Sequence, residues 1–360
     1  MVDTVTTDET GLAESKPLYL GKYEIREITT PYGMVLNEKI HTAALVYAGQ
    51  EIEITETSAS FYNERQKAAV SLDKVLEQNT QFGIGVNGEM SAVTFGLFAT
   101  EDLTAADSSV IPADGLLEIL SVDENGHAVC KTDLPFGSFY LKELSTDEHY
   151  TLSDEKHPIV FEYAGQNTAL VEIKANDGKP IDNDLIYGKI HGLKKDEDGD
   201  ALGGAVIGLF KADCTEFTRE NAILTAVSRE DGGFSFADVP YGNWIVREIE
   251  APTGFVLSDE TFAVTVDKDG AVIEVEIENA LIRGTVQLTK VDKDYPDNKL
   301  TGAEFAVYRD SNGNKELDTD DELLGTLTET GTGVYEMPDL IYGGYFVKET
   351  KAPEGFYLDE

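Results

Sequence analysis

Residues 241–248 read Tyr-Gly-Asn-Trp-Ile-Val-Arg-Glu, a turn followed by alternating apolar side chains that end on a glutamate. Copies of this phrase recur at intervals of roughly 100 residues, the length of a small β-sandwich domain. Self-similarity at such a fixed period indicates tandem copies of one structural unit. The four copies end at Glu27, Glu143, Glu248 and Glu349.

Three further phrases recur between these copies. One alternates apolar residues and ends on a lysine, a second sets small residues before an aromatic, and a third ends on an asparagine. β-branched and aromatic residues dominate the phrases, and turn signals such as Asp231-Gly-Gly233 separate them, which is typical of antiparallel strands. The lysines are Lys74, Lys194 and Lys290, and the asparagines are Asn63, Asn183 and Asn279.

The order of the phrases predicts an all-β chain of immunoglobulin-like β-sandwich modules joined end to end. We expect complete modules at 67–186 and 187–282. Residues 1–66 hold the phrases of the C-terminal half of a module, and residues 283–360 hold a module without its last strand and asparagine. Both ends are therefore expected to be cut from a longer chain.

The 360 residues carry 68 acidic and 28 basic side chains, a formal net charge of −40. Nucleic acids and anionic membrane surfaces are polyanions, so this charge argues against both as partners. The cysteines, Cys130 and Cys214, lie in different modules, and no disulfide framework is expected. The sequence has no apolar run of transmembrane length, no signal-peptide pattern and no sorting tail.

The two-residue period of a strand predicts which way the recurring Lys, Glu and Asn point. Lys194 has the parity of Ile190, and Glu248 has the parity of Trp244, so both are expected to face the core. Asn279 continues the inward positions of its own phrase, and the other copies follow the same rule. Burying a lysine and a glutamate is costly, so a repeated buried triplet is where function should be sought.

Such a triplet can react. Desolvation favours the neutral amine of lysine and the neutral acid of glutamate. A neutral amine is a nucleophile, and a protonated glutamic acid can polarise the asparagine carbonyl and shuttle protons as ammonia leaves. Holding amine and amide in contact adds a large effective molarity. The competing interpretation is a buried ion pair with a hydrogen-bonded asparagine, or charges that snorkel out at the sheet edge.

The ordered phrases resemble the Cna protein B-type and SpaA-like pilin repeats of Gram-positive surface proteins, which have a prealbumin-like fold. The resemblance covers essentially the whole chain and includes the Pro-x-Gly that follows three of the four glutamates. It implies two isopeptide bonds, one between Lys74 and Asn183 assisted by Glu143, and one between Lys194 and Asn279 assisted by Glu248. The residues left without a full triplet are Lys290, Glu349, Glu27 and Asn63.

Module 67–186 departs from this pattern. After Glu143 it reads Leu-Ser-Thr-Asp-Glu-His-Tyr in place of Pro-x-Gly, and a longer run precedes Asn183. It also carries an insertion at 105–115.

One acidic stretch, residues 310–321, resembles a calcium loop. Lys315 stands where such a loop needs glycine, so an acidic hairpin tip is the competing interpretation. No other cofactor is expected. The calcium ligands would be Asp310, Asn312, Asn314, Asp318 and Asp321.

The leading functional hypothesis is a structural stalk segment of a cell-wall-associated adhesin or pilin-like protein, located outside the cell. Its partners would be the neighbouring modules of a longer chain. The alternative is an adhesin module that recognises a host matrix protein or a glycan through loops or strand edges, most of all at the 105–115 insertion. Nothing in the sequence supports an enzyme with an external substrate, and the chemistry expected is single-turnover self-cross-linking.

Overall fold

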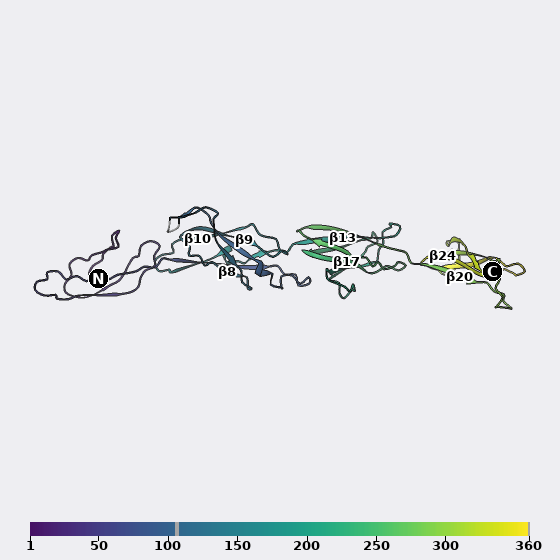
Figure 1. The fold of residues 1–360 in the computed structure, drawn as a ribbon, viewed down its shortest axis with the longest axis horizontal. Helices are drawn as coiled ribbons and strands as arrows, with labels where there is room; N and C mark the ends of the chain where they lie inside the picture. Colours follow the sequence, from purple (N-terminus) through teal and green to yellow (C-terminus); the bar gives the residue numbers. More distant parts are fainter. Residues whose placement is uncertain (105–107, 359–360) are drawn as a thin grey trace. The chain divides into compact units, whose positions relative to one another are not determined.

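The computed structural model describes residues 1–104 and 108–358. Within them the chain forms twenty-five strands and two single-turn 3-10 helices, η1 (Glu89–Ala92) and η2 (Ala175–Gly178) (Figure 1). The predicted all-β class is thereby confirmed. The chain divides into two compact units, Met1–Asp184 and Leu185–Glu360. None of the described helices is long and apolar enough to cross a membrane.

The first unit begins with a single antiparallel pair of strands. Strand β1 (Gly21–Ile25) lies against β2 (His41–Leu45), with Tyr23 opposite Ala43. The phrase that ends at Glu27 therefore forms a strand, as its alternation predicts.

The rest of the first unit is a sandwich of two sheets. The first sheet has the order β10-β9-β4-β7, and in the second β3 lies between β11 and β12 and also pairs with β8. A small hairpin of β5 and β6 flanks residues 105–107, which lie outside the described residues. The strands are β3 (Lys67–Leu76), β4 (Thr94–Ala99), β5 (Leu103–Thr104), β6 (Val110–Ile111), β7 (Leu116–Ser121), β8 (His127–Val129), β9 (Gly137–Ser145), β10 (Lys156–Phe161), β11 (Leu170–Lys174) and β12 (Ile181–Asn183).

The core of this sandwich is made by alternate residues of both sheets. Leu72 of β3, Phe95 of β4 and Leu141 of β9 are buried together with Phe139 and Ile159. The first strand pairs in parallel with the last strands, so that Lys74 lies opposite Ile181. The two ends of the module are thus brought side by side.

The second unit opens with a sandwich of the same design. Its sheets have the orders β16-β13-β19 and β15-β14-β17-β18, and β13 pairs in parallel with the last strand, β19. Every second residue of β13 from Gly188 to Lys194 is buried, which is the period of two that a sandwich face imposes. The strands are β13 (Tyr187–Asp196), β14 (Val206–Lys211), β15 (Leu224–Val227), β16 (Gly233–Pro240), β17 (Gly242–Glu250), β18 (Phe262–Val266) and β19 (Ala271–Asn279).

The final part of the second unit has two three-stranded sheets, β20-β24-β23 and β22-β21-β25, around a core that includes Phe305, Val307 and Tyr335. Among residues 283–358, β20 pairs only with β24, whereas β3 and β13 each also have a parallel partner. The strands are β20 (Arg283–Thr289), β21 (Glu304–Arg309), β22 (Glu322–Thr326), β23 (Thr328–Gly331), β24 (Val334–Ile341) and β25 (Tyr345–Lys351).

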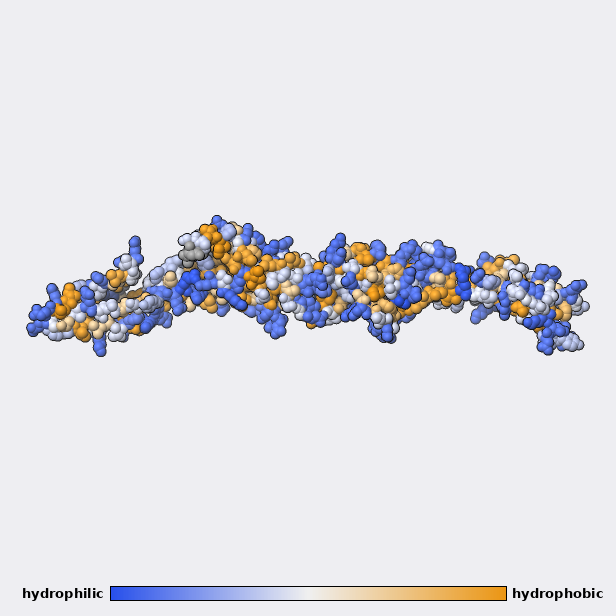
Figure 2. All heavy atoms as spheres, in the orientation of Figure 1, coloured by the Kyte–Doolittle hydropathy of each residue, from blue (hydrophilic) through white to orange (hydrophobic). Residues whose placement is uncertain are grey.

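The surface mixes hydrophilic and apolar residues. On the face drawn in Figure 2, hydrophilic residues are spread over every part of the chain, with apolar patches between them. Exposed apolar side chains include Val110, Leu116 and Ile119, which belong to β6 and β7.

Candidate functional site

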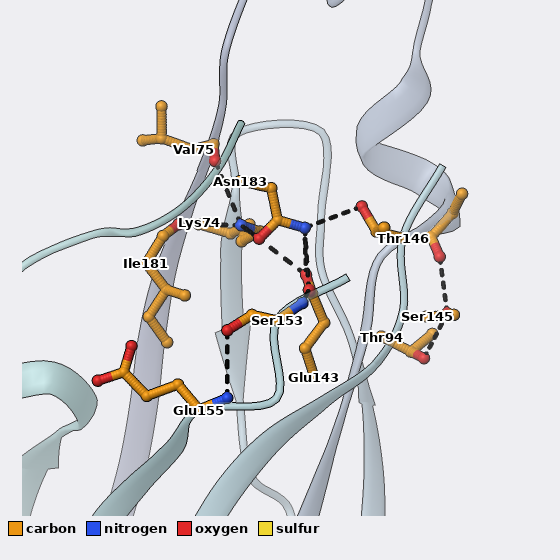
Figure 3. A network of polar contacts seen from close by, with 11 residues as sticks. Lys74, Val75, Thr94, Glu143, Ser145, Thr146, Ser153, Glu155, Ile181 and Asn183 are labelled. Atoms are coloured by element: carbon orange, nitrogen blue, oxygen red, sulfur yellow. Dashed lines mark hydrogen bonds and ion pairs between the residues drawn. The ribbon is translucent and has the colours of Figure 1, made fainter. Parts of the chain in front are cut away.

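Lys74, Glu143 and Asn183 meet inside the sandwich of the first unit (Figure 3). Lys74 Nζ donates a hydrogen bond to Asn183 Oδ1 across 2.7 Å, and it lies 3.8 Å from Glu143 Oε1. Asn183 Nδ2 donates to Glu143 Oε1 and Oε2 at 3.0 and 2.9 Å. The three residues are 2%, 2% and 3% exposed, so the site is dry.

The strand pairing explains why these residues meet. Lys74 and Asn183 come from adjacent parallel strands, β3 and β12, and both side chains are on the inward face. Glu143 comes from β9 in the opposite sheet, where it pairs with Phe95 on the buried face. A lysine and an asparagine from one sheet thus face a glutamate from the other.

Backbone groups hold the amine and the carboxylate in place. Lys74 Nζ also donates to the carbonyl oxygens of Ile181 at 3.2 Å and Val75 at 3.3 Å. Glu143 Oε2 accepts the backbone N–H of Ser153 at 3.0 Å. Burial in the core lowers the pKa of Lys74, because desolvation outweighs the charges of Glu143 and nearby aspartates that act in the opposite direction.

A second triplet, Lys194, Glu248 and Asn279, meets in the sandwich of 187–282. Lys194 Nζ lies 3.9 Å from Glu248 Oε1, and Asn279 Nδ2 donates to the same oxygen at 3.0 Å. Their exposures are 0%, 1% and 1%, and burial lowers the pKa of Lys194. The amine donates to the carbonyl oxygens of Lys195 and Ile277 at 3.2 and 3.3 Å, which repeats the contacts of Lys74.

The two triplets differ at the asparagine carbonyl. Asn183 Oδ1 accepts a hydrogen bond from Lys74, whereas Asn279 Oδ1 is buried with no hydrogen-bond partner among the described residues. A buried acceptor without a partner costs about 1–3 kcal/mol. In either site the amide lies within reach of a lysine whose neutral form is favoured by burial.

The remaining recurring residues come together as pairs. Asn63 Nδ2 donates to Glu27 Oε2 at 2.7 Å, and both residues are half-buried. Lys290 Nζ forms an ion pair with Glu349 at 2.9 Å. The sequence predicts that the first pair lacks a lysine and the second an asparagine, and the structure shows each pair in contact.

Two supporting features were not anticipated from the sequence. The first is a backbone N–H that Glu27, Glu143 and Glu248 each accept from the residue 10 positions later, at Asn37, Ser153 and Ser258. The second is a turn glycine with a positive φ that accepts the backbone N–H of each recurring lysine. Dipeptides such as Asn125-Gly126 mark these turns in the sequence, but nothing in them indicates the lysine contact. The glycines are Gly126 for Lys74, Gly232 for Lys194 and Gly333 for Lys290.

The acidic stretch 310–321 forms an exposed loop between β21 and β22. Asp318 accepts hydrogen bonds from the side chains of Asn312 and Asn314, and Asp321 accepts the backbone N–H of Ser311 and Asp318. Within the described residues, no group of three or more His, Cys, Asp or Glu side chains is placed to hold a metal ion. The calcium loop therefore stays a prediction.

Both cysteines are free thiols. Cys130 Sγ donates to Glu118 at 2.9 Å, and burial raises the pKa of the thiol to about 12. A thiol with so high a pKa is a poor nucleophile, because the thiolate is the reactive form.

The TIE protein of Bacillus anthracis matches with a TM-score of 0.56 at 20% identity, over 91% of this chain and 51% of that one, so this chain spans about half its length. A streptococcal ancillary pilin matches with a TM-score of 0.30 at 17% identity, covering 81% of this chain and 92% of the pilin. BcpA, the major pilin subunit of Bacillus cereus, gives 0.32 and 16%, covering 80% and 89%.

No curated protein sequence matches the chain. The model of the SpaA family, described as a prealbumin-like fold domain, matches residues 1–59, 188–281 and 284–360. These segments make up more than half of the chain, and they include the triplet of Lys194, Glu248 and Asn279. The chain therefore belongs to the SpaA family of prealbumin-like fold domains.

Proposed function

We propose that this chain is a structural segment of a cell-surface stalk whose complete modules are closed by isopeptide bonds, Lys74 to Asn183 and Lys194 to Asn279. The observation that carries the proposal is the dry contact of Lys74 Nζ with Asn183 Oδ1 at 2.7 Å, with Glu143 beside both. Glu143 would stabilise a charged Lys74 as an ion pair, but burial lowers the pKa of Lys74 and so favours the neutral, nucleophilic amine.

The reaction follows from the contacts. The neutral amine of Lys74 attacks Cγ of Asn183, and a new bond forms between Nζ and Cγ. Glu143 takes a proton from Nζ and gives it to Nδ2, to which both of its oxygens are hydrogen-bonded. The Cγ–Nδ2 bond then breaks and ammonia leaves, so one amide replaces another and no oxidant or cofactor is consumed. Glu248 has the same role for Lys194 and Asn279.

The bond has a mechanical consequence. Each one joins the first strand of a module to its last strand, β3 to β12 and β13 to β19. These strands are parallel neighbours, so a pull on the two ends of the module would otherwise shear them past each other. A covalent amide there carries the load, and unlike a disulfide it is not reduced.

The surface location rests on the family and on the solved structures that the chain resembles, several of which are Gram-positive pilins. We propose an extracellular, cell-wall-associated protein whose immediate partners are the neighbouring modules of a longer chain. The net charge of −40 is consistent with this and disfavours polyanionic partners.

A second candidate is an adhesin module for a host matrix protein or a glycan. The hairpin of β5 and β6 favours it, because Val110 is 59% exposed there and Leu116 and Ile119 of β7 are exposed as well. Pull-down against matrix proteins and glycan arrays, with a variant that lacks the hairpin as control, separates the two candidates. Retention that depends on the hairpin would favour the adhesin.

Intact-mass measurement tests the leading proposal. The purified chain should be lighter than its sequence mass by two ammonia molecules. Glu248→Ala should remove one of the two losses while Lys194 and Asn279 remain, and Glu143→Ala should remove the other. A chain with the unmodified sequence mass would overturn the proposal, and peptide mapping would assign each bond to its lysine and asparagine.

A further inference from the structure

The Lys74 site contains a fourth polar side chain that the triplet does not account for. Thr146 follows the end of β9 and its Oγ1 lies 3.1 Å from Asn183 Nδ2 (Figure 3). The hydroxyl oxygen accepts a hydrogen bond from this amide nitrogen, which also donates to Glu143. The nitrogen contacted by Thr146 is the atom that must leave as ammonia in the proposed reaction.

The equivalent position in the other complete module has no hydroxyl. Counting three residues from the glutamate gives Thr146 after Glu143 but Ala251 after Glu248. Asn279 Nδ2 accordingly donates to Glu248, with no second side-chain acceptor among the described residues. The two sites are built from the same three residue types, and they differ at this hydroxyl and at the asparagine carbonyl, which accepts a hydrogen bond from the lysine only at Asn183.

We propose that Thr146 is a catalytic residue of the Lys74–Asn183 cross-link, acting as the second acceptor for the departing nitrogen. The inference rests on the proposed isopeptide function and extends it to a residue outside the Lys, Glu and Asn triplet.

The hydrogen-bond partners of the Asn183 side-chain amide support this role of Thr146. An asparagine side chain has two N–H donors, and here the acceptors around Asn183 Nδ2 are both carboxylate oxygens of Glu143 and the hydroxyl of Thr146. With Lys74 donating to Oδ1, the amide is held at both of its polar ends. These contacts fix the orientation of the amide beside the amine.

The hydrogen bond from Asn183 Nδ2 to the Thr146 hydroxyl becomes stronger as the reaction proceeds. When Glu143 delivers a proton to Nδ2, this nitrogen becomes more positive and donates more strongly. Thr146 Oγ1 and the Glu143 carboxylate are then two acceptors already in place around it, and no reorganisation is needed. A hydrogen bond that strengthens in this way accelerates bond cleavage rather than merely stabilising the folded module.

The test measures the rate of each cross-link in the same chain. Unreacted chain, purified from inclusion bodies in denaturant, is refolded by dilution, quenched in acid at set times and digested. Mass spectrometry then gives the linked fraction of Lys74–Asn183 and, as internal reference, of Lys194–Asn279. The variants are Thr146→Val, which keeps the shape without the hydroxyl, Thr146→Ser, which restores the hydroxyl, and Ala251→Thr in the other module.

We expect Thr146→Val to slow the Lys74–Asn183 bond by roughly ten- to a hundred-fold, with no change at Lys194–Asn279. Thr146→Ser should recover most of the rate, and Ala251→Thr should accelerate the Lys194–Asn279 bond. Thr146→Val at the wild-type rate, or Thr146→Ser as slow as Thr146→Val, would overturn the role of the hydroxyl. Absence of both bonds from the wild-type chain would instead overturn the proposed function itself.

Discussion

Replacing Asn279 by alanine removes the carbon that would receive Lys194 and leaves the ion pair of Lys194 with Glu248, at 3.9 Å, in place. The variant should therefore fold without its cross-link. The proposed bond would close a loop of roughly 85 residues, so a variant without it should be about 4–5 kcal/mol less stable, because its unfolded state is less constrained. This is a large part of the 5–15 kcal/mol that a domain typically has.

The chain offers a specific probe for this measurement. Trp244 is its single tryptophan, and it is buried on β17, so tryptophan fluorescence reports on module 187–282 alone. With a urea dependence of about 1–3 kcal/mol per molar for a module of this size, the midpoint should fall by at least about 1.3 M. Intact mass must show one ammonia loss in the variant and two in the wild type.

Asn183→Ala is the matched control. It removes the other cross-link, in the unit that contains no tryptophan, and should leave the Trp244 unfolding midpoint unchanged. Equal midpoints for wild type and Asn279→Ala, in samples whose masses differ by one ammonia, would refute the claim that the bond stabilises the module by closing its loop.

Three further predictions concern single residues. His157 is 3% exposed, and burial lowers its pKa below 6.5 in the folded protein. The unfolded chain therefore binds a proton at a higher pH than the folded one. The stability of the first unit should be full above about pH 6.5 and should fall as the pH drops below it. His157→Phe, which copies Phe262 at the matching position of β18, should flatten this dependence in calorimetric scans between about pH 5 and 7.5, and an unchanged slope would contradict the assignment. Gly232→Ala places a Cβ 2.3 Å from the Lys194 carbonyl oxygen at a φ of 76°, and should lower the stability of the module by roughly 1–3 kcal/mol and slow the Lys194 cross-link. Gly199→Ala has a φ of 86° and open space around its Cβ, so it controls for backbone strain alone. Equal effects of the two variants would show that the contact with Lys194 is not the cause. Gly33→Ala would bring its Cβ within 2.9 Å of the Phe136 ring and should increase proteolysis between residues 34 and 66, whereas Gly49→Ala, with nothing nearby, should not; identical cleavage of both would argue against this packing.

Much of the architecture could be predicted because the chain repeats itself and because a strand has a period of two. Lys194 faces inward because Ile190 does, and no tertiary information is needed for that step. The meeting of Lys194 with Asn279 required more, namely the parallel pairing of β13 with β19, which the repeat suggests only through the family resemblance.

The parts that escaped prediction depend on contacts across the sandwich or on a single residue. Thr146 is an ordinary threonine in the sequence, and only the position of Asn183 gives its hydroxyl a role. The segment 79–92 has no counterpart of equal length in module 187–282, yet it buries Phe82 and Ile84. Tyr150 is buried beside Gly85 of this segment, and its hydroxyl donates to the Glu77 carbonyl oxygen, a contact between residues far apart in the sequence.

The exposure of the three lysines suggests how folding and reaction are coupled. The side chains of Lys74 and Lys194 are 0% exposed, whereas that of Lys290 is 21% exposed next to Glu349. The fully buried lysines are the ones on strands that have a parallel partner, and this partner strand also carries the asparagine. The same strand thus delivers the amide and excludes water, so the amine loses its solvation only when its target is present. Under the proposed function, this arrangement would keep the lysines from reacting early and would let the bond form only once the last strand has docked.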